Sequence, residues 1–119
     1  MARSDFSFTY QFRVRWSEVD PQAVVFNARY LDYADIAITE YYRAVGFRAH
    51  HPDEPLEFHV KRAIVTWHKP IEADEMIDVM ARTERSGTTS MTQRVEIHGA
   101  NAESADDLRA EIELVNVHV

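Results

Sequence analysis

The feature that most constrains the fold is a long helical pattern with an unusually wide apolar face. It runs from Ala28 to about Val45. Asn27, a residue type common at helix N-termini, comes just before it, and Gly46, which is typical of helix ends, comes just after. The apolar positions with helical spacing are Tyr30, Leu31, Ala34, Ala37, Ile38, Tyr41, Tyr42 and Val45. A face this wide predicts a helix contacted on more than one side, as when a sheet curves around it.

Strand patterns surround this helix. Residues 6–16 alternate between aromatic or apolar residues and polar ones, which predicts a half-buried strand. Four further strands are predicted after the helix, at residues 56–68, 75–85, 88–98 and 108–119. In the last strand the apolar residues shift from even to odd positions at Leu114 and Val115. That shift predicts a β-bulge, or a strand end that is buried on both faces.

The predicted element order is therefore β-α-β-β-β-β. It indicates a single α+β domain over residues 1–119, with one long helix and an antiparallel sheet of about five strands. A sheet this small has exposed edges and one uncovered face. Pairing with further copies of the chain, as a homodimer or homotetramer, is the expected solution.

Composition narrows the function classes. The net charge of −7 argues against nonspecific nucleic-acid binding through a positive field. The absence of cysteine excludes disulfides, thiolate nucleophiles and cysteine metal sites, and it fits a reducing cytoplasm. The first ten residues lack the apolar run of a signal peptide, and no stretch approaches the length of a membrane span. We therefore expect a cytoplasmic protein with no membrane or nucleic-acid partner.

Asp20 is the acid whose position calls for an explanation, because it lies between the end of the first strand and the start of the helix. One interpretation is that Asp20 and Pro21 form a surface turn. The other is that its carboxylate faces the helix N-terminus, where backbone N–H groups lack intrahelical partners. The residue types alone leave both interpretations open.

Two segments resemble a known family. Residues 20–30 read DPQAVVFNARY, which is similar to the pattern D-x-x-G-x-V-[aromatic]-x-x-x-Y. Residues 68–79 read HKPIEADEMIDV, which looks like a second pattern, [RK]-P-I-x-x-x-D. Both patterns occur in hotdog-fold acyl-CoA thioesterases of the 4-hydroxybenzoyl-CoA thioesterase/YbgC-like family, and the element order resembles that family over nearly the whole chain. The resemblance implies the hotdog fold, a five-stranded antiparallel sheet wrapped around one long central helix.

The resemblance also implies an activity, the hydrolysis of an aliphatic or aromatic acyl-CoA to a carboxylate and CoA. Asp20 would be the nucleophile or the general base. The backbone N–H near Phe26 or Asn27 would stabilise the oxyanion, since a thioester needs hydrogen-bond donors opposite its nucleophile. Val25 and Tyr30 would contribute to the substrate-binding site. No cofactor is implied beyond the CoA thioester itself.

For the CoA moiety, the resemblance points to the turn between the third and fourth strands, where Arg85 and Ser90 are the candidates. Lys61 and Arg62 are further candidates for phosphate contacts. Solvated strand charges explain each of these basic residues equally well.

The chain departs from the family pattern at Ala23, where the family has glycine. This departure motivates an alternative function, a non-catalytic acyl-CoA-binding or assembly module. A dehydratase is disfavoured because no histidine lies in the helix-entry segment. His50 and His51 lack the spacing of metal ligands, so no metal site is predicted. Glu57 and Asp74 are fallback carboxylates with an expected structural role.

Overall fold

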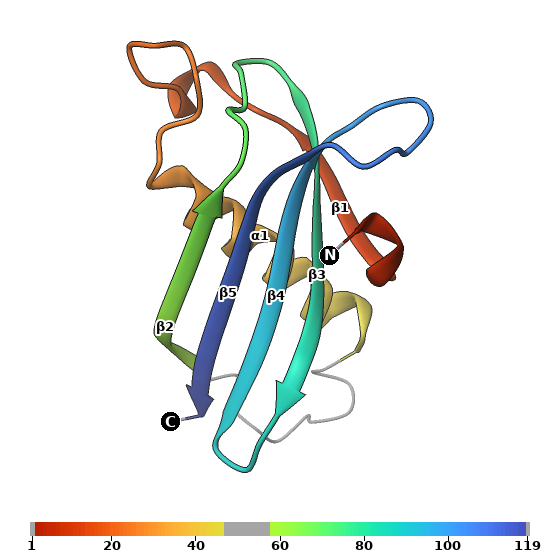
Figure 1. Ribbon diagram of the computed structural model, residues 1–119. Helices are drawn as coiled ribbons and strands as arrows, with labels where there is room; N and C mark the ends of the chain where they lie inside the picture. The colour runs from red at the N-terminus through yellow and green to blue at the C-terminus, as the bar shows by residue number, and fades with distance from the viewer. Residues whose placement is uncertain (1, 47–57, 119) are drawn as a thin grey trace.

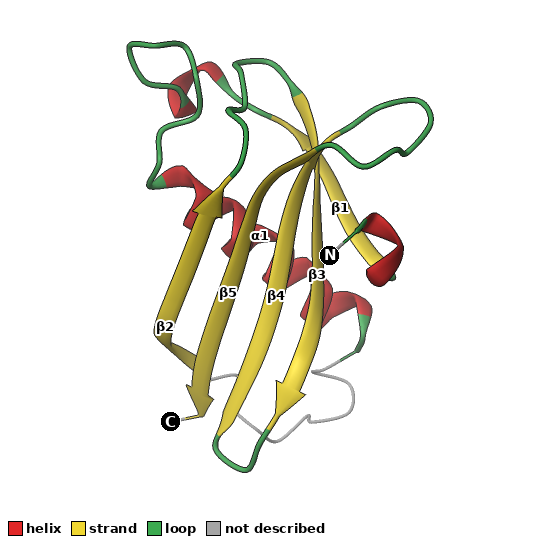
Figure 2. Cartoon of the chain, viewed as in Figure 1, coloured by secondary structure: helices red, strands yellow, loops and turns green. Residues whose placement is uncertain are grey.

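The computed structural model describes residues 2–46 and 58–118, and in them it forms one curved sheet and one long helix (Figures 1 and 2). The elements are β1 (Phe8–Arg13), α1 (Arg29–Ala44), β2 (Phe58–Trp67), β3 (Met76–Ser86), β4 (Ser90–Gly99) and β5 (Leu108–His118), with 3₁₀ turns at Arg3–Asp5 and Trp16–Glu18. All neighbouring strands are antiparallel, in the order β1-β3-β4-β5-β2. The predicted α+β architecture and strand order along the chain are confirmed.

The helix α1 lies across one face of the sheet and buries its apolar side there (Figure 1). Ala34 and Ala37 are completely buried, because their small side chains let the helix approach the strands closely. On the sheet, the facing positions pair across the strands as Phe12 with Ile77, Val79 with Ile97, and Val95 with Ile112. This layer of side chains is the hydrophobic core.

Both ends of α1 show how far the helix prediction reaches. Gly46 has a φ of 70° just after the C-cap, so its predicted role as helix terminator is confirmed. The prediction that Asn27 caps the N-terminus is wrong, because Ala28 is the N-cap residue and no side chain caps it. The Phe26 carbonyl instead accepts a hydrogen bond from the Arg29 N–H at 2.9 Å.

The predicted apolar face of α1 is also corrected. Leu31 is 41% exposed and Val45 is 50% exposed, so both point away from the core. Tyr33, which the pattern did not include, is completely buried. Its hydroxyl reaches the buried carboxylate of Glu18 at 2.9 Å, which satisfies its polar end.

The bulge predicted in the last strand lies elsewhere. From Ala110 to Asn116 the even-numbered residues of β5 are buried, so the alternation does not change at Leu114 and Val115. The irregularity is at Arg109, because Ile97 pairs with Ala110 while His98 pairs with Leu108. A polar residue, Asn116, takes the inward position near the strand end and donates to the Gln93 side chain at 2.9 Å. When a polar residue takes an inward position, the spacing of the apolar residues does not reveal which face of the strand is buried.

The two edges of the sheet are covered differently. The edge strand β1 packs under α1 through Phe8 and Phe12. The other edge strand, β2, leaves most of its residues exposed on both faces, including the apolar side chains Val60 at 57% and Ile64 at 39%. Within the described residues nothing pairs with the outer edge of β2.

Candidate functional site

Asp20 begins a tight loop between the 3₁₀ turn Trp16–Glu18 and α1. Its backbone N–H donates to Val24 O, and its carbonyl accepts from the Ala23 N–H, each at 2.9 Å. Its carboxylate oxygen Oδ1 accepts from the Gln22 N–H at 2.8 Å. Among the described residues no hydrogen bond engages the other oxygen, Oδ2. Asp20 therefore closes a turn with one oxygen and leaves the second one available.

Ala23 occupies a backbone conformation that favours glycine. Its φ is 63°, in the left-handed region, where the Cβ of an L-residue costs roughly 1–2 kcal/mol. The loop keeps this conformation because hydrogen bonds hold it on both sides of Ala23. The alanine therefore strains the loop without opening it.

The connection between β2 and β3 supports this loop from below. The Val25 N–H donates to Ile71 O at 2.8 Å, and Val24 forms an antiparallel bridge with Glu72. Val25 also bridges Val19 across the loop. The Asp20 loop is thus held like a short strand against the residue 71–72 segment. The motif match at residues 68–79 falls on this supporting segment.

Glu18 is a site-building residue that the sequence analysis missed. It is 8% exposed, and one of its carboxylate oxygens, Oε1, accepts hydrogen bonds from the Tyr33 hydroxyl at 2.9 Å and the Arg15 N–H at 2.8 Å. Its backbone carbonyl accepts from the Phe26 N–H at 3.0 Å. Glu18 thereby ties the loop to α1. Nothing in its local sequence distinguishes it from the solvated acids of this acidic chain.

That same bond distinguishes the two predicted oxyanion donors. The Phe26 N–H already donates to Glu18 O within the chain. The Asn27 and Ala28 N–H groups make no hydrogen bond to any other described residue. Ala28 is the N-cap residue of α1 and Asn27 directly precedes it, so both N–H groups lie near the positive end of the helix dipole.

Val25 and Tyr30 lie beneath the site. Each is 2% exposed, so within the chain they have almost no surface to offer a substrate. Tyr30 packs edge-on against Trp67, the last residue of β2, with ring centroids 6.0 Å apart. Burial raises the pKa of the Tyr30 hydroxyl above its ordinary value, while a backbone hydrogen bond from Ile71 and the charge of Arg109 oppose that rise. The charges of Glu75 and Asp20 add to the rise of the Tyr30 pKa.

Arg109 anchors the supporting connection to the sheet. Arg109 is 6% exposed, and its guanidinium donates to Pro70 O at 3.0 Å, to Asp107 Oδ2 at 2.8 Å and to both carboxylate oxygens of Glu75. Hydrogen bonds from Arg109 and Lys69 hold the pKa of the Asp107 carboxyl at about 2. Burial alone would raise the pKa of Glu75, but the hydrogen bonds of Arg109 and the Glu72 backbone bring it below its ordinary value. The bulge at Arg109 thus fixes the connection that carries Ile71.

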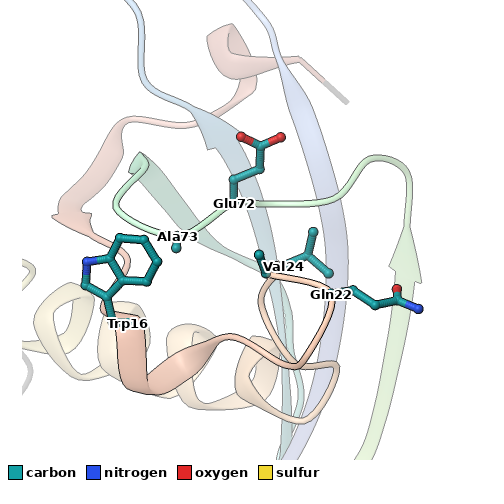
Figure 3. Close-up of a pocket in the computed structure, with 6 residues that line it drawn as sticks. Trp16, Gln22, Val24, Glu72 and Ala73 are labelled. Atoms are coloured by element: carbon teal, nitrogen blue, oxygen red, sulfur yellow. The ribbon is translucent and has the colours of Figure 1, made fainter.

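A shallow open pocket lies on the outer side of the Asp20 loop (Figure 3). Its lining residues are Trp16, Gln22, Ala23, Val24, Glu72 and Ala73. Trp16 is 71% exposed and stands at one side of the pocket, which Ala73 also lines (Figure 3). The pocket combines an aromatic face and small apolar side chains with an amide and a carboxylate.

The predicted CoA residues are not brought to Asp20 within one chain. Arg85 and Ser90 are exposed and flank the β3–β4 hairpin, at the end of the sheet opposite the Asp20 loop (Figure 1). With a rise of about 3.3 Å per residue, the length of β3 puts roughly 30 Å between the two ends. Lys61 and Arg62 are exposed on β2.

The remaining candidates do not form a second centre. Among residues 2–46 and 58–118, no group of three or more histidine, aspartate and glutamate side chains is placed to hold a metal ion. His50, His51 and Glu57 lie outside the described residues. Asp74 has a φ of 65° in an exposed turn and faces Arg13 at 3.8 Å. No helix in these two ranges is long and apolar enough to cross a membrane.

Comparison with known proteins identifies the family. Residues 22–105 match the family described as the Thioesterase superfamily. A search of curated protein sequences gives no significant match. The matched range begins just after Asp20 and includes the supporting connection and the β3–β4 hairpin.

Solved structures share the fold at low sequence identity. A 4-hydroxybenzoyl-CoA thioesterase bound to 4-hydroxybenzoyl-CoA is 15% identical, with a TM-score of 0.81 over 92% of this chain and 81% of that one. A probable thioesterase from Bartonella henselae is 20% identical, with a TM-score of 0.78 over 92% and 87%. A 1,4-dihydroxy-2-naphthoyl-CoA thioesterase from Synechocystis is 16% identical, with a TM-score of 0.78 over 92% and 80%. These likenesses confirm the hotdog fold.

Proposed function

Because this chain belongs to the Thioesterase superfamily, we propose that it is an acyl-CoA thioesterase whose catalytic carboxylate is Asp20. The observation that carries the proposal is that one loop holds both a carboxylate oxygen without a hydrogen bond to any described residue, Asp20 Oδ2, and two N–H groups without an acceptor among those residues, those of Asn27 and Ala28. A thioester carbonyl needs a nucleophile on one side and hydrogen-bond donors on the other.

The reaction consumes one water molecule and yields a carboxylic acid and CoA thiol. Asp20 either attacks the carbonyl carbon and displaces CoA thiolate, forming an anhydride that water then hydrolyses, or removes a proton from a water that attacks the carbonyl and displaces the thiolate. In either route the C–S bond breaks and the thiolate takes up a proton to give CoA thiol. In both routes the carbonyl oxygen gains negative charge as the new C–O bond forms. We assign the stabilising hydrogen bond to the Asn27 N–H, since the Phe26 N–H is already bonded to Glu18 O.

The exposed edge of β2 supports a homo-oligomeric enzyme. A ten-residue strand with open apolar side chains on both faces is a template for pairing. A second copy that pairs its own β2 antiparallel to this one, around a two-fold axis, extends the sheet and covers the β2 edge of both copies. Such a pairing brings the partner subunit beside the Trp67 end of β2 and the Asp20 loop. A monomeric mass at assay concentration, measured by sedimentation, would contradict this arrangement.

The alternative is a non-catalytic acyl-CoA-binding module, and the strained Ala23 is the observation that favours it. Thiol release from a panel of aromatic and aliphatic acyl-CoAs separates the two functions, when paired with calorimetric binding of the same ligands. Turnover of at least one acyl-CoA is expected. Tight binding without release of thiol from any of them selects the non-catalytic module, and neither binding nor release rejects both.

A further inference from the structure

Two exposed tryptophans flank the Asp20 loop, and they differ in their surroundings. Trp67 is 49% exposed and lies at the end of β2, where its ring rests edge-on against buried Tyr30. Trp16 is 71% exposed and borders the shallow pocket on the outer side of the loop. A thioester held at Asp20 has two arms, the acyl group and the pantetheine chain. The two tryptophans offer each arm a different environment.

The Trp67 side suits an apolar acyl group. Tyr30 is 2% exposed, so Trp67, at 49%, is the aromatic ring that an acyl group can contact on this side. Trp67 faces the helix side of the sheet, because its ladder partner Ala110 is a core residue. Aromatic rings prefer offset or edge-to-face contact with other rings, so this corner favours a planar acyl group.

The Trp16 side suits the pantetheine chain. Pantetheine carries two amide groups and must lead from the thioester out to solvent, where the nucleotide lies. The pocket beside Trp16 is open, and Gln22 and Glu72 supply an amide and a carboxylate to its lining (Figure 3). Val24 and Ala73 provide a small apolar floor for the methylene groups.

We propose that the thioester lies across the Asp20 loop with its acyl group against Trp67 and its pantetheine chain in the pocket beside Trp16. The assignment rests on the proposed thioesterase function and makes Trp67 the residue that determines acyl preference. The strand β2 contributes this residue at its very end, next to Tyr30 in the first turn of α1. An aryl-CoA is therefore the preferred substrate class.

The test compares Trp67→Ala with Trp16→Ala, each as the matched control of the other. Benzoyl-CoA and hexanoyl-CoA serve as substrates, and free CoA serves as a ligand in calorimetry. Trp67→Ala is expected to lower kcat/KM for benzoyl-CoA about tenfold relative to hexanoyl-CoA, and to leave CoA binding within about twofold of wild type. Trp16→Ala is expected to weaken CoA binding about fivefold and to leave the benzoyl-to-hexanoyl ratio unchanged.

The orientation is overturned if Trp16→Ala changes the substrate ratio while Trp67→Ala weakens CoA binding. An unchanged substrate ratio in Trp67→Ala also overturns it. Trp67→Phe keeps an aromatic face and is expected to retain most of the preference, so its loss would also count against the assignment. Light scattering of each variant checks that the oligomeric state is that of wild type. If wild type hydrolyses no thioester, the proposed function fails. The CoA-binding comparison then still decides whether Trp16 lines the pantetheine pocket.

Discussion

The two ends of the sheet are built differently. At one end, the Asp20 loop, the residue 68–75 connection and Arg109 are joined by a continuous series of hydrogen bonds. At the other end, the β3–β4 hairpin holds Arg85 and Ser90 in exposed positions. Hydrogen bonds therefore fix the backbone at the end of the sheet where the thioester is proposed to bind. A catalytic group needs such support, because small displacements from the productive geometry are costly.

The largest expected effect comes from removing one backbone N–H donor at the end of the sheet that carries the Asp20 loop. Asn27→Pro deletes the N–H assigned to the oxyanion, and it is expected to lower kcat by about 10²–10³-fold. Asn27→Ala keeps that N–H and is the matched control, expected to stay within about threefold of wild type. Steady-state thiol release measures both. A large loss in Asn27→Ala would instead assign the role to the side-chain amide.

The next effect concerns the stability of the two ends. Arg109→Met leaves the carboxylates of Glu75 and Asp107 without their shared cation, and it is expected to reduce the free energy of unfolding by about 3–5 kcal/mol. Arg85→Met at the exposed hairpin is the matched control, expected to change it by less than about 0.5 kcal/mol. Urea denaturation measures both. Equal losses of unfolding free energy in the two variants would show that Arg109 stabilises the fold no more than the exposed Arg85 does.

Acid sharpens the comparison further. The pKa values of Glu75 and Asp107 are lowered in the folded state, so each carboxylate stabilises the fold above its unfolded pKa of about 4. This contribution is lost as the pH falls toward 2, the pKa of Asp107. Urea unfolding at pH 5 and pH 3 is expected to show a fall in stability, about 1 kcal/mol smaller in Asp107→Asn. An equal fall in stability in Asp107→Asn would contradict the stabilising role of the Asp107 carboxylate.

The smallest effect tests the strained loop itself. Ala23→Gly relieves the positive φ but gains unfolded-state entropy, so it is expected to stabilise the protein by only about 0.5 kcal/mol. Ala102→Gly, at an exposed residue without a positive φ, is the control and is expected to destabilise by about 0.5–1 kcal/mol. Thermal unfolding measures both, and the same sign for the two would show that Ala23 is unstrained.

The sequence predicted the fold well because strand alternation and the helix pattern are local properties. The bounds of α1 and all five strands lie within a few residues of the expected ones. The errors fall where polar residues take inward positions. Asn116 is polar but buried, so the inward positions of β5 cannot be found from apolar residues alone. Glu18 is also buried, although nothing in the sequence separates it from the exposed acids.

The candidate site was predicted in part. Asp20 and Asn27 could be proposed from the sequence, because the short loop between them keeps the two residues close together. The occupied N–H of Phe26 was out of reach, because its partner Glu18 O is fixed by a fold-back of the chain. Arg109 and Trp67 come from strands far along the sequence, and only the sheet topology joins them to the loop.

The most direct test of the account is thioester hydrolysis by Asp20→Asn, measured beside CoA binding. This variant keeps the size of the side chain and the oxygen that accepts from Gln22, but it removes the carboxylate. We predict a loss in kcat of at least about 10²-fold with CoA affinity within about threefold of wild type, while Asp74→Asn at the neighbouring turn keeps full activity. Wild-type turnover by Asp20→Asn would contradict the central claim.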